Sequence, residues 1–425
     1  MIVAVIGSGG REHALAQSIK LSSSVEKLYI IPGNPGTALL GENAAVNTED
    51  KEAVLSFCRE QGVDLVVIGP EIPLVNGLSD HLKAAGLPVF GPSAAAAEIE
   101  GNKSFAKSLM QKYSIPTADF KIYYKETEDE AVSYLKNCSY PVVIKASGLA
   151  AGKGVLICEN QDAALSALRE CFDDQVFGEA GNTVVIEEFM YGQEASVFAV
   201  TDGENFICLP AAQDHKRIGD LDTGKNTGGM GAYAPAPVVT DDILRETEEK
   251  IIKPTLAAMR KEGRTFAGCL YCGLMLTNEG VRVVEFNCRF GDPETQAVLP
   301  LLEGDFAKLL LSSATGKLDK NIVRYNGGAA VCVVLASGGY PDKFGKGFEI
   351  KGLDAAQQDG VFVYHAGTKF DGGKVVTSGG RVLGVTAVIK ENDLKLCKSK
   401  AYEALGKISF NNMYFRRDIA DKAIK

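Results

Sequence analysis

The sequence lacks the features that would place the chain in a membrane or in an oxidising compartment. No uninterrupted apolar run approaches the roughly twenty residues that a membrane-spanning helix needs. The first residues, "MIVAVIGSGG", pass from a short apolar run directly into glycines, without the basic and apolar regions of a secretion signal. The ten cysteines follow no regular spacing, which is typical of a reducing compartment. We therefore expect a cytoplasmic protein without a membrane partner.

The cysteine and charge patterns also argue against a structural metal and a nucleic-acid partner. Cys269 and Cys272 form a lone CxxC, but residues at i and i+3 of a strand face opposite sides, so we expect both to be packing residues. The net charge of −9 argues against nucleic acid. Local clusters of lysine and arginine would still suit an anionic small molecule. We expect a monomer, although the sequence leaves oligomers open.

A chain of 425 residues is too long for one ordinary core, and its patterns divide it into three parts. Residues 1–100 alternate short apolar strands with amphipathic helices, which predicts a parallel α/β domain. Residues 101–325 combine helices with glycine-rich hairpins, and residues 326–425 predict a small α+β domain. The fold class is thus multidomain, α/β and α+β. Ligands of the first domain are expected at the loops that follow its strands, "GSGGREH", "PGNPGT" and "GPEIPL".

The first of these loops is a broken dinucleotide motif. Gly7 and Gly9 fit G-x-G-x-x-G, but Glu12 stands at the third glycine, and no acidic residue ends the second strand. This argues against a nicotinamide-dependent enzyme. Gly9, Gly10 and the amides that follow could hold a single phosphate at a helix N-terminus, with Arg11 adding charge. A simple tight turn is the alternative.

The central part contains a glycine-rich hairpin, "VVIKASGLAAGKGVLIC". Because a strand and not a helix follows the glycines, a Walker phosphate loop is excluded. Its glycines permit a close approach of backbone to phosphate, and Lys153 lies at the tip. We interpret it as a lid over a triphosphate, with an ordinary hairpin as the alternative. Residues 211–237 show no periodicity and are predicted to be a long binding loop.

The stretch "VVEFNCRFGDPETQ" crowds polar groups between apolar ones. With a period of two, Val284, Phe286, Cys288 and Phe290 would share an apolar face, and Glu285, Asn287 and Arg289 the opposite face. The polar face meets either solvent, as on an edge strand, or a lined cavity. The preceding strand, "FAGCLYCGLML", is predicted to pair with it as a hairpin.

The motifs together resemble the glycinamide ribonucleotide synthetase family of ATP-grasp enzymes. "GSGGREHAL", "PGNPGTA", "VIGPEIPLV", "GLAAGKGV", "IEEFMYGQEAS", "QDHKRIGDLDTGKNTGGMGAY" and "VEFNCRFGDPETQ" occur in the family's order, from the first residue to about residue 420. The sixth and seventh are highly specific. The resemblance implies a central ATP-grasp domain at 101–325, with a mobile lid subdomain at about 118–190.

The resemblance also implies a reaction: ATP-dependent ligation of glycine to 5-phosphoribosylamine through glycyl phosphate, in purine biosynthesis. Magnesium or manganese would accompany ATP. The alternatives are another ATP-grasp carboxylate-amine ligase and a nucleotide-binding module without turnover.

Individual residues receive roles from the same resemblance. The metal ligands would be Glu285 and Asn287, and the catalytic residues Arg289, Asn287 and Lys145. ATP would be bound by Lys103, Lys145, Gly148, Gly152, Lys153, Gly154, Glu187, Glu188, Phe189, Met190 and Glu194. The two substrates would contact Gly9, Gly10, Arg11, Glu71, Asp214, Lys216, Thr227, Gly228, Gly229, Met230, Arg289, Asp292, Pro293 and Glu294.

Within these sets, the 187–190 segment would hold adenine and Glu194 the ribose. Asp292 and Glu294 would meet the amino group of glycine, and Gly10, Arg11 and Glu71 phosphoribosylamine. The sequence departs from the family at Ser147, where relatives commonly carry Asp, and at Lys225. Both are expected in mobile loops. The strand "GCLYCGLML" offers no further metal carboxylate, so the ligands of a second metal stay undefined.

Overall fold

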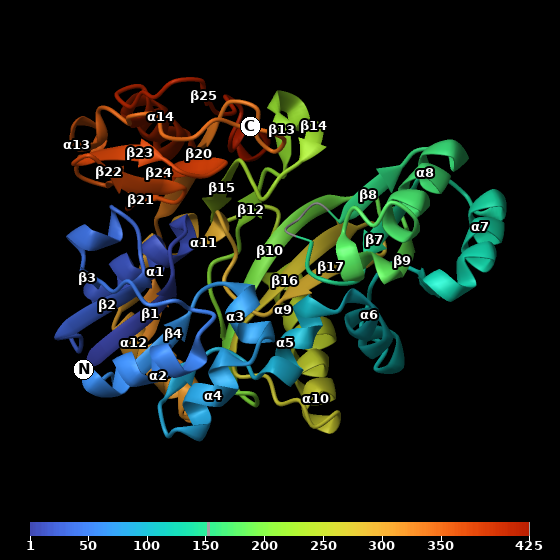
Figure 1. Cartoon of the computed structure of the whole chain (residues 1–425), viewed down its shortest axis with the longest axis horizontal. Helices are drawn as coiled ribbons and strands as arrows, with labels where there is room; N and C mark the ends of the chain where they lie inside the picture. Colours follow the sequence, from blue (N-terminus) through green and yellow to red (C-terminus); the bar gives the residue numbers. More distant parts are fainter. Residues whose placement is uncertain (151–153, 425) are drawn as a thin grey trace.

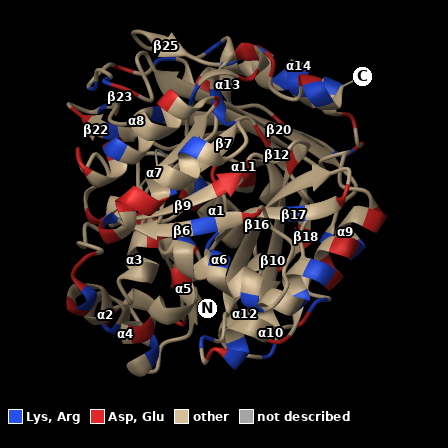
Figure 2. Cartoon of the chain, turned by 90° about the vertical axis from the view of Figure 1, so that its right-hand side faces the viewer, with Lys and Arg blue, Asp and Glu red and all other residues tan. Residues whose placement is uncertain are grey.

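The protein is described here from a computed structural model, which covers residues 1–150 and 154–424. The N-terminal and C-terminal parts of the chain lie on one side of the molecule, and a separate sheet with two helices projects on the other (Figure 1). Acidic and basic residues are interspersed along the ribbon on the side that carries those two helices, α7 and α8 (Figure 2). Among the described residues no helix is long and apolar enough to cross a membrane.

The N-terminal part forms the predicted parallel sheet, in the order β3-β2-β1-β4-β5. Its central strands are apolar throughout, as expected for parallel strands covered on both faces. The strands are β1 (Ile2–Gly7), β2 (Lys27–Pro32), β3 (Glu42–Asn43), β4 (Leu65–Ile68) and β5 (Val89–Phe90). The helices are α1 (Gly10–Lys20), α2 (Lys51–Glu60), α3 (Glu71–Val75), α4 (Leu78–Ala84) and α5 (Ala94–Gly101).

A four-stranded antiparallel sheet, β6-β9-β7-β8, follows and lies within the segment predicted as the lid. Strands β7 and β8 are the two arms of the predicted glycine-rich hairpin. The bounds are α6 (Lys103–Lys112), β6 (Phe120–Tyr124), α7 (Glu128–Asn137), β7 (Val142–Ala146), β8 (Val155–Cys158), α8 (Gln161–Phe172) and β9 (Thr183–Glu188).

A second antiparallel sheet, β11-β10-β16-β17, forms the centre of the molecule. The predicted hairpin is confirmed as β16 and β17. A π-helical turn over Glu248–Ile252 joins two helices, α9 and α10. The bounds are β10 (Gln193–Thr201), β11 (Phe206–Cys208), α9 (Asp241–Thr247), α10 (Lys253–Lys261), β16 (Gly268–Thr277), β17 (Gly280–Asn287), α11 (Glu294–Val298) and α12 (Phe306–Ala314). A small sheet pairs β18 (Leu302–Gly304) with β19 (Val323–Tyr325).

The C-terminal part is an antiparallel sheet, β12-β15-β20-β24-β21, with β25 paired to β20. Helix α14 packs on it, as expected for an α+β domain. Its later elements are β20 (Ala329–Ser337), α13 (Leu353–Ala356), β21 (Val361–His365), β22 (Thr368–Asp371), β23 (Lys374–Thr377), β24 (Arg381–Ile389), α14 (Leu394–Leu405) and β25 (Met413–Tyr414).

The expectation of an irregular loop over 211–237 is wrong. The segment contains four short strands: β12 (Gln213–Asp214), β13 (Arg217–Gly219), β14 (Thr223–Asn226) and β15 (Gly231–Ala234). Strands β12 and β15 join the C-terminal sheet, and β13 pairs with β14. Strands of two to four residues are too short to show a period in the sequence, which explains the error.

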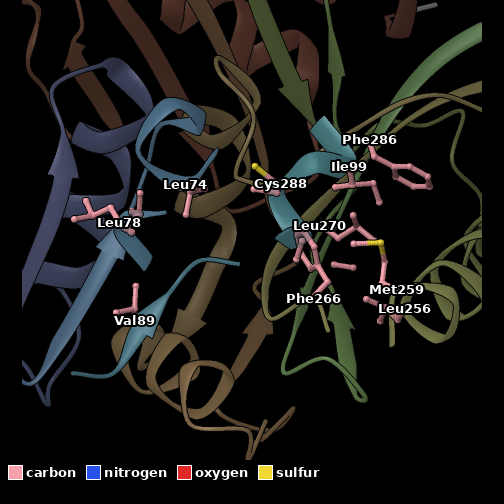
Figure 3. Close-up of a cluster of buried hydrophobic side chains, with 14 of the residues drawn as sticks. Leu74, Leu78, Val89, Ile99, Leu256, Met259, Phe266, Leu270, Phe286 and Cys288 are labelled. Carbon is pink, nitrogen blue, oxygen red and sulfur yellow. The ribbon is translucent and has the colours of Figure 1, made fainter. Parts of the chain in front are cut away.

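Both faces of the central sheet pack against apolar side chains of the N-terminal domain. One buried cluster joins Leu74, Leu78 and Val89 to Leu270 and Phe286 (Figure 3). A second cluster on the opposite face includes β1, α11 and α12. Cys272 belongs to the first cluster and Cys269 to the second, so the prediction that they face opposite sides and pack is confirmed. The lid sheet has a separate core.

Candidate active site

One large cavity, of about 1050 Å³, lies where these parts meet. The N-terminal domain lines it with Arg11, Glu71 and Glu100, and the C-terminal domain with Tyr340, Arg381 and Lys422. The lid sheet and β17 complete the wall. Most predicted site residues line this cavity: Arg11, Glu71, Lys103, Lys145, Gly154, Glu187, Glu188, Phe189, Met190, Glu194, Asp214, Lys216, Thr227, Gly228, Glu285, Asn287, Arg289, Asp292 and Glu294.

Strand β17 presents Glu285 and Asn287 to the cavity, as the alternation predicts, and Arg289, two residues beyond the end of the strand, also lines it. The proposed apolar face is partly wrong. The register with β16 shifts between Gly273 and Leu274, so that Val284 is bulged out of the pairing. Val283 is therefore buried in the core, while Val284 lines the cavity.

Phe290, also assigned to that apolar face, packs in the second core cluster and not with Phe286 and Cys288. The strand ends at Asn287, and beyond it the period of two no longer applies.

Glu285 is surrounded by cations. Burial disfavours its charged form, but Lys216, Lys145 and Lys103 outweigh burial and hold the pKa of this carboxyl below its usual value. A charged carboxylate and the amide oxygen of Asn287 are hard donors that suit Mg²⁺ or Mn²⁺. Within residues 1–150 and 154–424 no group of three or more His, Cys, Asp or Glu side chains could hold a metal.

Arg289 is fixed by two carboxylates from the N-terminal domain. Its Nη2 lies 2.6 Å from Glu100 Oε1, and its Nε lies 3.3 Å from Glu71 Oε2. Burial disfavours the guanidinium charge, but Glu100 and Glu71 raise the pKa of Arg289 well above its usual value. Arg11 Nη1 lies 3.8 Å from the same Glu71 oxygen. Glu71 therefore links two other predicted substrate residues, Arg11 and Arg289.

The two predicted phosphate-binding lysines are held differently. Lys145 Nζ lies 2.9 Å from Glu187 Oε2 and donates to the carbonyl of the bulged Val284 at 3.0 Å. Lys107 Nζ shares the same Glu187 oxygen at 3.2 Å. Lys103 Nζ donates to the Gly148 carbonyl at 3.0 Å. The lid strands thus bring Lys145 to β17.

The segment predicted to hold a nucleoside is bounded by ion pairs. Glu188 pairs with Arg282, and Glu194 Oε2 lies 2.7 Å from Lys216 Nζ. Glu187, Glu188, Phe189 and Met190 all line the cavity. Nearby, burial raises the pKa of Asp214 to about 7, although Lys216 opposes the shift.

Asp292 and Glu294 occupy the end of the cavity next to the C-terminal domain. Arg381 on β24 lies 3.1 Å from Asp292 through Nη2, and its Nη1 donates to the carbonyls of Gly228, at 2.6 Å, and Asp292, at 2.7 Å. One oxygen of Glu294 accepts hydrogen bonds from Ser196 and Tyr271. Arg381 therefore ties the 228–229 backbone to the turn at Asp292.

Some predicted residues lie outside the cavity wall. Among the described residues, Gly9, Gly10, Gly148, Gly229, Met230 and Pro293 are not part of the lining. Gly229, with φ of +112°, packs so closely that a Cβ there would lie 2.4 Å from Pro293 Cδ, so it serves the turn. Gly152 and Lys153 fall outside the described residues.

The first glycine loop is filled by a side chain of its own helix. Gly9 N donates to Glu12 Oε2 at 2.6 Å. A Cβ on Gly7 or Gly69 would meet the Glu12 side chain within 2.4 Å. The residue that breaks the dinucleotide motif thus occupies its phosphate position. A phosphate at Gly9 would have to displace that carboxylate.

The two departures from the family pattern lie in unlike settings. Ser147 is buried, and its Oγ donates to Asn102 and accepts from the Ser104 amide. It directly follows β7, and the expectation that its loop is mobile stays a prediction. Lys225 is exposed and pairs with Asp342 at 2.8 Å.

The cavity residues that sequence reasoning missed include Glu100, Lys107 and Arg381. Lys107 stands one helical turn after Lys103, so an i, i+4 search on α6 would have found it. Glu100 and Arg381 reach the cavity only through contacts between domains, which no local pattern reports.

These features define an ATP-grasp protein: a lid sheet and a central sheet enclose a cavity with paired lysines and a Glu-Asn pair. The family description "Phosphoribosylglycinamide synthetase, ATP-grasp (A) domain" matches residues 101–295. The N and C domains of the same synthetase match residues 1–100 and 330–422. The chain belongs to the phosphoribosylglycinamide synthetase family, which confirms the resemblance and the predicted three-part fold.

Relatives agree with this assignment. The phosphoribosylamine–glycine ligase of Caldanaerobacter subterraneus subsp. tengcongensis is 48% identical over 420 residues, covering 99% of each chain. The crystal structure of the phosphoribosylamine–glycine ligase of Thermotoga maritima superposes with a TM-score of 0.83 at 34% identity, covering 99% of this chain and 100% of that one. These names confirm the predicted enzyme class, a carbon-nitrogen ligase.

The fold is shared more widely. The biotin carboxylase domain of Hydrogenobacter thermophilus 2-oxoglutarate carboxylase, solved with MgADP and bicarbonate, gives a TM-score of 0.74 at 17% identity. It covers 97% of this chain and 91% of that one. At this identity the likeness concerns the fold alone.

Proposed function

We propose that the chain joins glycine to 5-phosphoribosylamine through a glycyl phosphate, converting ATP to ADP and phosphate. Membership of the synthetase family supports this reaction. The observation that carries it is the convergence, on one cavity, of Glu285, Asn287 and Arg289 with Lys145 and Lys103. It assembles anion-binding groups beside hard oxygen donors, which phosphoryl transfer requires.

The chemistry explains why such groups are needed. A carboxylate is a poor electrophile toward an amine, because its charge and resonance must be overcome. Phosphorylation of glycine gives an acyl phosphate, whose phosphate leaves readily when the amine attacks the carbonyl. Arg289, Lys145 and Lys103 would stabilise the negative charge of the transferred phosphoryl group. The lid would exclude water, which otherwise hydrolyses the intermediate.

Glu285 and Asn287 are the residues that would hold Mg²⁺ or Mn²⁺. A divalent ion, when bound, neutralises charge on the ATP phosphates. The surrounding lysines keep Glu285 charged, so the residue is ready to act as a ligand at neutral pH.

Substrate contacts are assigned to charged side chains of the cavity wall. Arg11 and Glu71 would contact phosphoribosylamine, and Asp292 and Glu294 the cationic amino group of glycine. The backbone of 187–190 would hold adenine, with Glu194 at the ribose. We further propose that the enzyme acts as a cytoplasmic monomer, without nucleic-acid or membrane partners.

A coupled assay of ADP formation tests the reaction. ADP is expected only when ATP, glycine and phosphoribosylamine are all present. Because phosphoribosylamine is unstable, it is generated in the assay from ammonia and ribose 5-phosphate, which form it reversibly with loss of water, and a blank without protein gives the background. ADP formation with a different amine would favour another carboxylate-amine ligase. ATP binding without any ADP would favour a binding module.

A further inference from the structure

Glu100 is placed against ordinary preferences for a carboxylate. It lies in the last turn of α5, where the helix dipole disfavours negative charge, and its side chain is buried. A buried carboxylate is costly unless it is paired and hydrogen-bonded. Residues that violate local preferences in this way are often found at functional sites. The contacts of Glu100 show which site it serves.

Its two oxygens hold two parts of the same segment. Oε2 accepts the backbone N–H of Cys288 at 2.8 Å, and Oε1 lies 2.6 Å from Arg289 Nη2. One carboxylate therefore fixes both the backbone at the end of β17 and the guanidinium of the next residue. Glu71, the other partner of Arg289, is more exposed and contacts Nε at a longer 3.3 Å. Of the two partners, Glu100 makes the shorter contact with Arg289 and is the more deeply buried.

We infer that Glu100 is a positioning residue, which aims the Arg289 guanidinium into the cavity for the transfer step. This inference rests on the proposed function for the identity of that step. Glu100 acts through Arg289 and touches no substrate itself.

The test compares two glutamates of the same helix. Glu100→Gln keeps the size and one oxygen for the Cys288 amide, but it removes the charge that faces Arg289. Glu98→Gln is the matched control, because Glu98 also pairs with an arginine, Arg264 at 2.7 Å, and lies outside the cavity wall. We expect Glu100→Gln to lower kcat about 10- to 100-fold, the range typical of residues that orient an active-site group, with KM for ATP nearly unchanged. Glu98→Gln should leave both constants unchanged.

A double-mutant cycle separates positioning from general support of the fold. If Glu100 acts through Arg289, Glu100→Gln should have little further effect on kcat in an Arg289→Met background. Equal fold losses in both backgrounds would overturn the inference, as would wild-type kcat in a folded Glu100→Gln variant.

A second readout does not depend on the ligase reaction. The rate at which phenylglyoxal modifies Arg289, followed by peptide mass spectrometry, should rise several-fold in Glu100→Gln and stay constant in Glu98→Gln. An unchanged rate in Glu100→Gln would overturn the inference even if Arg289→Met fails to fold. If the wild-type protein forms no ADP from glycine and phosphoribosylamine, the proposed function fails, and the modification rate still decides whether Glu100 holds Arg289.

Discussion

Acid should destabilise this protein through histidines buried in the neutral form. His13 on α1 and His365 on β21 meet where the N-terminal and C-terminal domains join, and the His365 amide donates to His13 Nδ1 at 2.8 Å. A nitrogen that accepts this bond cannot carry a proton. Burial, helped by His365, lowers the pKa of His13 to about 3, and burial lowers that of His365 to about 4. Burial also lowers the pKa of His215 to about 3.

The size of the effect follows from linkage. In the unfolded chain these histidines bind protons below about pH 6.5. In the folded protein they bind protons only near pH 3 to 4. The free energy of unfolding therefore decreases as the pH falls below about 6.5. Between pH 7 and pH 5 each histidine should cost about 2 kcal/mol, and the three together about 6 kcal/mol. That loss is comparable with the whole stability of many domains, roughly 5 to 15 kcal/mol.

The assay is urea unfolding at pH 7 and pH 5, followed by circular dichroism because the chain has no tryptophan. His13→Asn keeps an acceptor near the position of Nδ1 but cannot be protonated. Between pH 7 and pH 5 the free energy of unfolding of this variant should fall by about 2 kcal/mol less than that of the wild type. Comparing the two proteins cancels the contributions of the other titrating groups. His81→Asn, at a half-exposed histidine on α4, is the control. An equal pH dependence in wild type and His13→Asn would refute the reasoning.

Three further outcomes are expected at the cavity. Glu285→Gln should remain folded by circular dichroism, while its ADP formation should lose several kcal/mol of transition-state stabilisation; near wild-type turnover would contradict the metal assignment. Arg381→Met should raise KM for glycine, measured in the ADP assay, because the 228–229 backbone and Asp292 lose a shared donor, and it should leave KM for ATP unchanged; the opposite pattern would count against this reading. Asp214→Asn should gain stability relative to wild type as the pH rises from 5 to 8 in urea unfolding, because the raised pKa of Asp214 makes its ionisation near pH 7 destabilising, and a constant difference would exclude that titration.

Local patterns in the sequence were sufficient for the strands that carry the central chemistry. Alternation located Glu285 and Asn287 on one face of β17, and the glycines located the β7–β8 hairpin. The same rule failed at Val284, because a bulge inserts one residue and reverses the faces on either side of it. A period of two holds only while the register is continuous.

Contacts between distant segments could not be predicted in this way. Glu187 was expected beside a nucleoside, yet its carboxylate pairs with Lys145 and Lys107. Arg381 follows Asp292 by 89 positions, and Glu100 precedes Arg289 by 189. Residues so far apart in the sequence cannot be paired from a local pattern. The relative position of the domains determines such pairs, and the cores shared around the central sheet fix that position.

The distribution of these cores gives the lid expectation a physical basis. The lid sheet buries its own cluster of apolar residues, all between Tyr123 and Ile186, whereas the N-terminal domain and central sheet share both of theirs. Described contacts from the lid segment to β17 include polar ones: Lys145 donates to the Val284 carbonyl, and Glu188 on β9 pairs with Arg282 on β17. Breaking such bonds exchanges them for water at a modest net cost, while separating a shared core would expose apolar surface. Motion of the lid should therefore leave β17 and the segment that follows it in place, and the site can open without losing the frame that aligns Glu285, Asn287 and Arg289.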